Sequence, residues 1–96
     1  SWAEPLAGEV QHLVDFEGPA LAALPAGATV EAVASTGAGG RVIQAHAYPL
    51  PPELGGGWRL QLRVQRDDAT QPLELRAFLR SGTTTLTETW AALLPP

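Results

Sequence analysis

The carboxylates are the residues of this sequence whose chemistry is easiest to name. Hydrolysis of a glycosidic bond commonly uses two carboxyl groups that lie about 5–9.5 Å apart. Glu74 and Glu88 stand in two segments that we expect to pair as a hairpin, which would bring these side chains close together. Asp15 and Glu17 are the other candidates in a strand-like segment. If this chain by itself hydrolysed a glycosidic bond, two of these four carboxylates would be the catalytic pair.

Ion pairing is nevertheless our preferred interpretation of these carboxylates, because perturbed carboxyl groups occur in structural ion pairs as well as in active sites. Glu88 shares its strand parity with Trp90. We therefore expect Glu88 to point towards the buried face, where it needs a partner such as Arg76. Glu74 is expected to lie on a solvated face and to pair with an arginine, a contact that is weak at a surface. The candidate partners of Glu74 are Arg59, Arg63 and Arg76.

Metal binding and nucleophilic catalysis have less support. His12 and His46 are the only histidines, they fall in different strand-like segments, and zinc sites usually need three or four ligands. Ser35 and Ser81 lie at turns or strand ends, and neither stands in a Gly-x-Ser-x-Gly motif. The chain has no cysteine, which excludes disulfides and thiolate chemistry. We therefore predict no catalytic residue, no metal site and no cofactor.

The aromatic side chains are the best candidates for contacts with a partner or a ligand. Trp58 and Trp90 stand at inward positions of alternating segments, so we predict that both rings lie in the core. Trp2 stands in an N-terminal segment without periodicity, and Tyr48 comes directly before Pro49. Trp2 and Tyr48 are the residues that we expect at an interface with a neighbouring domain or in contact with sugar.

Composition excludes two classes of partner. The formal net charge is −4, and all 6 basic residues are arginines. Phosphate contacts dominate the affinity of proteins for nucleic acid, so this weakly acidic chain is not expected to bind it. The longest apolar runs fall far short of the roughly 18–20 residues that a membrane span needs, so we also predict no membrane insertion.

A two-residue periodicity runs through the chain and predicts an all-β fold. The clearest strand covers residues 58–65, where Trp58, Leu60, Leu62 and Val64 alternate with polar side chains. Further strands are predicted over residues 11–17, 29–35, 41–48, 73–80 and 85–90, and a seventh either in the Leu-Pro segment or near the C-terminus. Short, regularly spaced strands without a helical period are typical of an immunoglobulin-like β-sandwich of about seven strands.

The connections between these strands are marked by glycine and proline. Residues 20–26 allow one helical turn before Pro25 and Gly27 end it. The glycine-rich residues 37–40 predict a hairpin loop, and residues 49–57 form a loop rich in proline and glycine. A chain of 96 residues has room for one domain. We assign residues 1–8 to a linker or to the artificial boundary of a fragment, and residues 9–96 to the domain.

Three stretches resemble a known family. They are LVDFEG at residues 13–18 followed by LP at residues 24–25, GGWR at residues 56–59, and LELRAFLRSG at residues 73–82 followed by LTETW at residues 86–90. In this order, over residues 11–94, they resemble the C-terminal domain of the osmoregulated periplasmic glucan biosynthesis proteins G and D. The turn at residues 37–40, which has almost no side chains, and the proline-rich residues 50–53 depart from that pattern. These differences affect the expected contacts of the loops rather than the expected fold.

The resemblance implies a location and a setting that composition alone does not indicate. Members of this family are periplasmic proteins of Gram-negative bacteria that act in making β-linked glucose polymers. A large N-terminal β-sandwich with a carbohydrate cleft is followed by a smaller immunoglobulin-like domain. This chain resembles only the smaller domain, so no residue that is thought to act on glucan carries over to it.

Three functions follow in order of preference. The first is a non-catalytic accessory domain that packs against the glucan-handling N-terminal domain. The second is a carbohydrate-binding module that contacts β-glucan directly, which predicts exposed aromatic rings in a groove. The third is an enzyme in its own right. We place the enzyme last, because so small a sandwich is expected to have little room for a deep pocket of about 300 Å³ or more.

Overall fold

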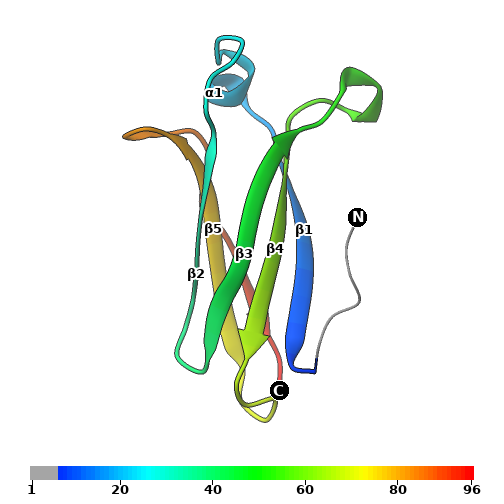
Figure 1. Ribbon diagram of the computed structural model, residues 1–96, viewed down its shortest axis with the longest axis vertical. Coiled ribbons are helices and arrows are strands. Elements are labelled where there is room, and N and C mark those ends of the chain that lie inside the picture. The colour runs from blue at the N-terminus through cyan, green and yellow to red at the C-terminus, as the bar shows by residue number, and fades with distance from the viewer. Residues whose placement is uncertain (1–6) are drawn as a thin grey trace.

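The computed structural model describes residues 7–96, and Trp2 lies outside the described residues. Its strands form two antiparallel sheets that face each other (Figure 1). The three-stranded sheet has the order β1–β4–β3 and consists of β1 (Glu9–Phe16), β4 (Trp58–Arg66) and β3 (Gly40–Pro49). The structure thus confirms the predicted β-sandwich.

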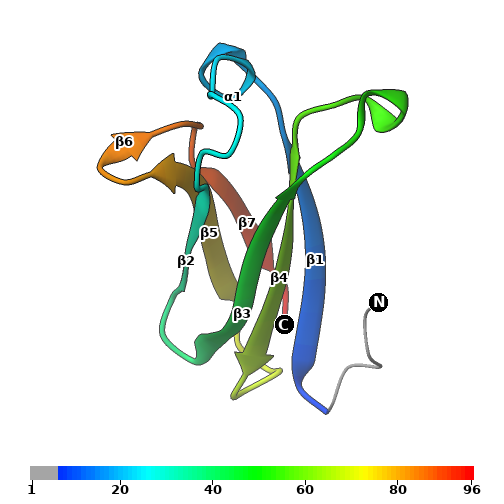
Figure 2. The same cartoon turned by 45° about the horizontal axis from the view of Figure 1, so that its top comes forward.

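The four-stranded sheet is built around β5 (Leu73–Ser81). On one side β5 pairs with β2 (Glu31–Thr36). On the other side it pairs first with β6 (Thr84–Thr85) and then with β7 (Trp90–Leu94) (Figure 2). The short helix α1 (Pro19–Ala22) and the 3₁₀ helix η1 (Pro52–Leu54) lie at one end of the sandwich. No helix within residues 7–96 is long and apolar enough to cross a membrane.

The core lies where the inward residues of β4 and β5 meet. In both strands an apolar residue stands at every second position, and these positions supply the largest fully buried side chains: Leu60, Leu62, Val64, Leu73, Leu75 and Leu79. Because successive side chains of a strand point to opposite faces, this alternation gives each strand one apolar and one polar face. The predicted inward faces of residues 58–65 and 73–80 are confirmed.

A second group of buried residues closes the end that carries α1. Leu21 of α1, Leu79 and Leu86 form this group, and Phe16 and Trp58 pack against it while partly buried. Trp58 is therefore at the margin of the core rather than at its centre. Trp90 is also half-buried and packs against the main core. Both rings belong to the apolar interior as predicted, but neither is fully enclosed.

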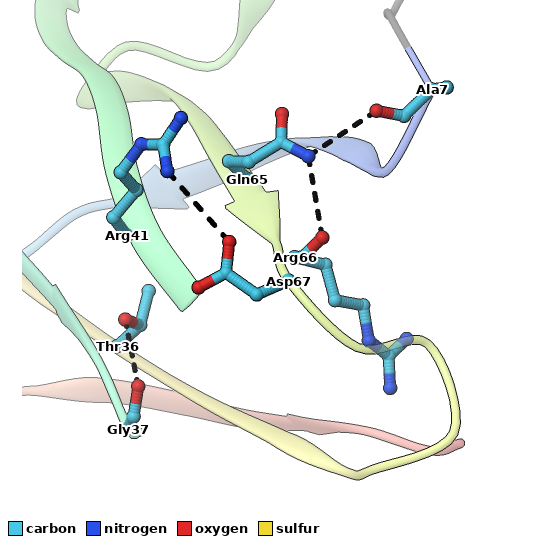
Figure 3. A network of polar contacts seen from close by, with 7 residues as sticks. All are labelled: Ala7, Thr36, Gly37, Arg41, Gln65, Arg66 and Asp67. Carbon is cyan, nitrogen blue, oxygen red and sulfur yellow. Dashed lines mark hydrogen bonds and ion pairs between the residues drawn. The ribbon is translucent and has the colours of Figure 1, made fainter. Parts of the chain in front are cut away.

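The opposite end of the sandwich is held together by polar contacts to the end of β4 (Figure 3). The Gln65 side chain donates to the carbonyl oxygens of Ala7 and Arg66 at 3.3 Å, and Arg41 lies 3.8 Å from Asp67. The Arg66 guanidinium donates to the carbonyl oxygen of Pro95 at 2.7 Å. These contacts hold Ala7, which precedes β1, and Pro95, which follows β7, against the end of β4.

Two predicted connections are wrong. Residues 37–40 do not close a hairpin within one sheet, because β2 belongs to the four-stranded sheet and β3 to the three-stranded sheet. Residues 85–90 are not one strand: β6 ends at Thr85, β7 begins at Trp90, and residues 86–89 belong to neither. The seventh strand lies near the C-terminus, which was one of the two predicted places.

Candidate functional site

An open groove of about 910 Å³ lies at one edge of the sandwich. One wall is the end of β1 and the start of α1, residues 14–20, and the other wall is residues 85–91. The expectation that the domain has little room for a deep pocket of about 300 Å³ or more is not contradicted by this hollow, because it is open to solvent. We call this hollow the edge groove.

A local irregularity of β5 pairing opens the edge groove. Arg80 pairs with Thr85 in β6 and Ala77 pairs with Trp90 in β7, so two residues of β5 lie opposite the four residues 86–89. The Leu79 N–H donates to the Thr87 hydroxyl oxygen at 3.1 Å, and that hydroxyl donates to the Glu88 carbonyl oxygen at 2.9 Å. The surplus residues are thus not paired with β5, as in a β-bulge, and the Leu79 amide is satisfied by the Thr87 hydroxyl instead.

Aromatic rings line the seam between the two sheets at this edge. His12 of β1 and Trp90 of β7 lie with their ring centroids 5.7 Å apart and their planes tilted by 55°. This distance is typical of favourable ring pairs. Phe16 and Trp90 both line the edge groove, and both are partly buried. The lining of the groove therefore combines partly buried ring surface with exposed polar side chains.

Three carboxylates also line the edge groove: Asp15, Glu17 and Glu88. Asp15 is paired with Arg59, at 2.7 Å from the arginine Nε. Neither Glu17 nor Glu88 belongs to any of the five ion pairs formed within residues 7–96. Both are exposed. The groove thus keeps two carboxylates that are not neutralised by an arginine within the described part of the chain.

The sequence-based pairing of Glu74 with Glu88 is wrong. Glu74 lies opposite Leu93 of β7 and pairs with Arg76 of its own strand, at 2.7 Å. Glu88 is exposed rather than inward, and Arg76 is not its partner. The physical reason is the surplus in residues 86–89, which breaks the alternation that assigned Glu88 to the inner face. The expected pairing of Glu74 with an arginine is confirmed.

Tyr48 lies on a different surface, the outer face of the three-stranded sheet. Two cross-strand rows form it, because Leu13 and His46 both flank Gln61 of β4, and Asp15 and Tyr48 both flank Arg59. We call this surface the polar face and define it by six side chains: Leu13, Asp15, His46, Tyr48, Arg59 and Gln61.

The side chains of the polar face hold one another in place. The rings of His46 and Tyr48 are stacked, with centroids 5.9 Å apart and planes 30° apart. The Gln61 amide donates to the Tyr48 hydroxyl at 3.4 Å. Arg59 makes two parallel hydrogen bonds to the Asp15 carboxylate, at 2.7 and 3.0 Å. Such bidentate pairs fix the orientation of both partners, so the polar face is ordered before anything binds to it.

The Asp15–Arg59 pair predicts a dependence of stability on pH. The hydrogen bonds from Arg59 hold the pKa of Asp15 below its ordinary value of 3.8. Because the pKa is lowered in the folded state, the pair contributes fully to the stability of the fold above pH 3.8. This stabilisation is lost as the pH falls through the folded-state pKa. We expect NMR titration of the Asp15 carboxyl carbon to give a midpoint below 3.8. In Arg59→Gln the midpoint should rise, and an unchanged midpoint would contradict the assignment.

The remaining candidates do not come together. His12 lies in β1 and His46 in β3 on the opposite face of the same sheet. Ser35 lies in β2, and Ser81 ends β5. Within residues 7–96 no group of three or more histidine, cysteine, aspartate or glutamate side chains is placed to hold a metal ion.

The edge groove is not apparent from the amino-acid sequence. Strand alternation places Trp90 in the core and Glu88 in a buried ion pair, and it does not distinguish Glu17 from the other carboxylates. The five threonines between residues 83 and 89 were the available signal. Threonine hydroxyls bond readily to nearby backbone groups, as Thr87 does here, so such a stretch is a place where strand pairing can be interrupted.

Comparison with known proteins identifies the family. Residues 3–94 match the family described as "Periplasmic glucan biosynthesis protein, MdoG". Glucans biosynthesis protein G of Ralstonia nicotianae is 50% identical over 84 residues, covering 88% of this chain and 16% of the relative. The proteins of the same name from Pectobacterium atrosepticum and Serratia proteamaculans are 44% and 41% identical over 88 residues, covering 92% of this chain and 16% of each relative.

Most of this chain takes part in each match, but the chain spans only 16% of the length of the curated relatives. The expected family is therefore confirmed, whereas the comparisons do not place the matched part at the C-terminal end of the relatives. The chain belongs to the periplasmic glucan biosynthesis protein family MdoG.

Proposed function

We propose that this chain is a non-catalytic, C-terminal accessory domain of a longer periplasmic glucan biosynthesis protein. In this proposal it packs through the polar face against the glucan-handling N-terminal domain and braces it. The relatives, named for glucan biosynthesis, are about six times as long as the matched part, which supports a module within a larger protein. The name of the family supports a periplasmic location.

The preorganised polar face is the observation that carries the packing proposal. Protein interfaces are enriched in tyrosine and arginine and depleted in lysine, and this face presents Tyr48 and Arg59 in a chain without lysine. Leu13 adds an apolar side chain that is 51% exposed. Because the Asp15–Arg59 pair already fixes the guanidinium, little side-chain entropy remains to be lost when a partner covers it.

Leu13→Lys tests this packing. We expect the domain to unfold at a higher temperature within the full-length protein than as the 96-residue chain, and we expect Leu13→Lys to remove that difference. The physical reason is that the lysine ammonium would have to be desolvated at the interface. A coupling of about 1 kcal/mol would move the midpoint by about 4–8 °C, which differential scanning calorimetry of both proteins can resolve.

Leu93→Lys is the matched control. Leu93 is 67% exposed and lies on the outer face of the other sheet, so the same substitution there should leave the difference in midpoint unchanged. If Leu93→Lys removes the difference and Leu13→Lys does not, the packing face is the four-stranded sheet. If the domain unfolds at the same temperature in both proteins, it is not braced by packing at all.

A further inference from the structure

We propose that the edge groove binds a segment of a neutral oligosaccharide, with Trp90 as the stacking surface and Glu17 and Glu88 as acceptors for sugar hydroxyl groups. The choice of β-linked glucose units as the ligand rests on the proposed function. The groove is distinct from the surface of the packing proposal, because Trp90, Glu17 and Glu88 line it and none of these three belongs to the polar face. Asp15 is the one side chain that the two surfaces share.

The dimensions of the edge groove suit a chain ligand. Ligand sites commonly have volumes of about 300–1,000 Å³, and the groove has about 910 Å³. It is bounded by two stretches of chain that come from different sheets, and it is open to solvent. A segment of an oligosaccharide can therefore enter it from solvent.

The ring surface in the edge groove fits the apolar face of a pyranose. The C–H bonds on that face carry a small positive charge, and the face of an aromatic ring carries a negative one. Trp90 is half-buried and lines the groove, and the tilted contact with His12 limits the freedom of its ring. Phe16 extends the apolar surface from the opposite wall.

The polar side chains of the edge groove fit hydroxyl groups rather than anions. Ionised carboxylates only accept hydrogen bonds, and hydrogen bonds to charged acceptors are about twice as strong as neutral ones. Glu17 and Glu88 are outside all of the ion pairs formed within residues 7–96, and no arginine lines the groove. A phosphate or carboxylate ligand would be repelled, whereas a polyol can donate to both glutamates.

The test is an NMR titration of the 96-residue chain with β-linked glucose tetrasaccharides, namely cellotetraose, laminaritetraose and sophorotetraose. We expect saturable shifts at millimolar sugar in the amides of residues 14–20 and 85–91 and in the Trp90 indole. Trp90→Ala should abolish them. Because Trp90 packs against the core, Glu88→Gln provides a second variant that does not touch the core, and we expect about tenfold weaker binding in it.

Glu53→Gln is the matched control for Glu88→Gln. Glu53 is exposed, belongs to none of the ion pairs within the described residues and does not line the edge groove, so its replacement should leave the affinity unchanged. Equal weakening in both variants would indicate a nonspecific effect of charge and would overturn the proposal.

Three other outcomes also overturn it. One is the absence of shifts with all three sugars. Another is a set of shifts confined to the polar face around Tyr48. The third is stronger binding of a tetralysine peptide at the edge groove with loss of that binding at high salt, which would make the groove an acidic peptide site, since only charged ligands are screened by salt. All of these are measured without a neighbouring domain, so they are distinct from a failure of the packing proposal.

Discussion

Leu62→Ala is expected to lower the free energy of unfolding by about 2–5 kcal/mol, a large part of the roughly 5–15 kcal/mol that holds a domain folded. Leu62 is 0% exposed in the central strand of the three-stranded sheet. Its neighbours across that sheet are His12 and Ala45. The loss combines the removal of buried apolar surface with a cavity that the surrounding side chains fill only in part. Urea denaturation measures it as a lower midpoint with an unchanged slope.

Leu54→Ala is the control for this substitution. The same atoms are removed, but Leu54 lies in η1 and is 66% exposed. We expect a change within about 0.5 kcal/mol, as for most surface positions. Similar losses in the two variants would mean that the assignment of the core is wrong.

Gly57→Ala is expected to lower the free energy of unfolding by more than the unfavourable backbone conformation alone would. Gly57 has φ +75°, and a β-carbon built there would lie 2.5 Å from the Phe16 carbonyl oxygen. Left-handed backbone costs a non-glycine residue about 1–2 kcal/mol. The contact adds to this because a backbone atom cannot move aside without shifting the end of β1. The measurement is again the free energy of unfolding from urea denaturation.

Gly56→Ala separates the two contributions. Gly56 has φ +66° but no atom within 4 Å of the added β-carbon, so its replacement reports the conformational cost alone. The loss in Gly57→Ala should exceed the loss in Gly56→Ala, and it should be accompanied by amide shifts around Phe16. Equal losses would show that the end of β1 gives way freely and that the close approach has no structural importance.

The inward faces of the strands were predictable from the sequence because they depend on a local property. In β4 and β5 the apolar side chains stand at every second residue, and a strand must turn one such set towards the interior. The glycines and prolines of residues 49–57 likewise predicted a loop, which Leu50 and Gly57 close through a backbone hydrogen bond of 2.9 Å. No information from distant parts of the chain was needed for either prediction.

The sheet to which each strand belongs was not predictable in the same way. The turn at residues 37–40 has the composition of a hairpin loop, yet β2 and β3 join different sheets. Composition describes how tightly the chain turns, but not whether the returning strand pairs with its predecessor or crosses to the facing sheet. That choice depends on strands further along the chain, because β2 pairs with β5 and β3 pairs with β4.

The sequence by itself determined the class of fold, the inward residues of the long strands, the position of the helical turn at α1 and the resemblance to a family. Tertiary structure decided where strands pair and therefore which side chains meet. Asp15 and Arg59 are 44 residues apart in sequence. Glu88 does not lie on the inner face, because the four residues 86–89 lie opposite only two residues of β5 and the strand alternation is interrupted there. Alternation is a property of neighbouring residues, whereas register is set between strands that lie far apart in the chain, and the edge groove exists because of register.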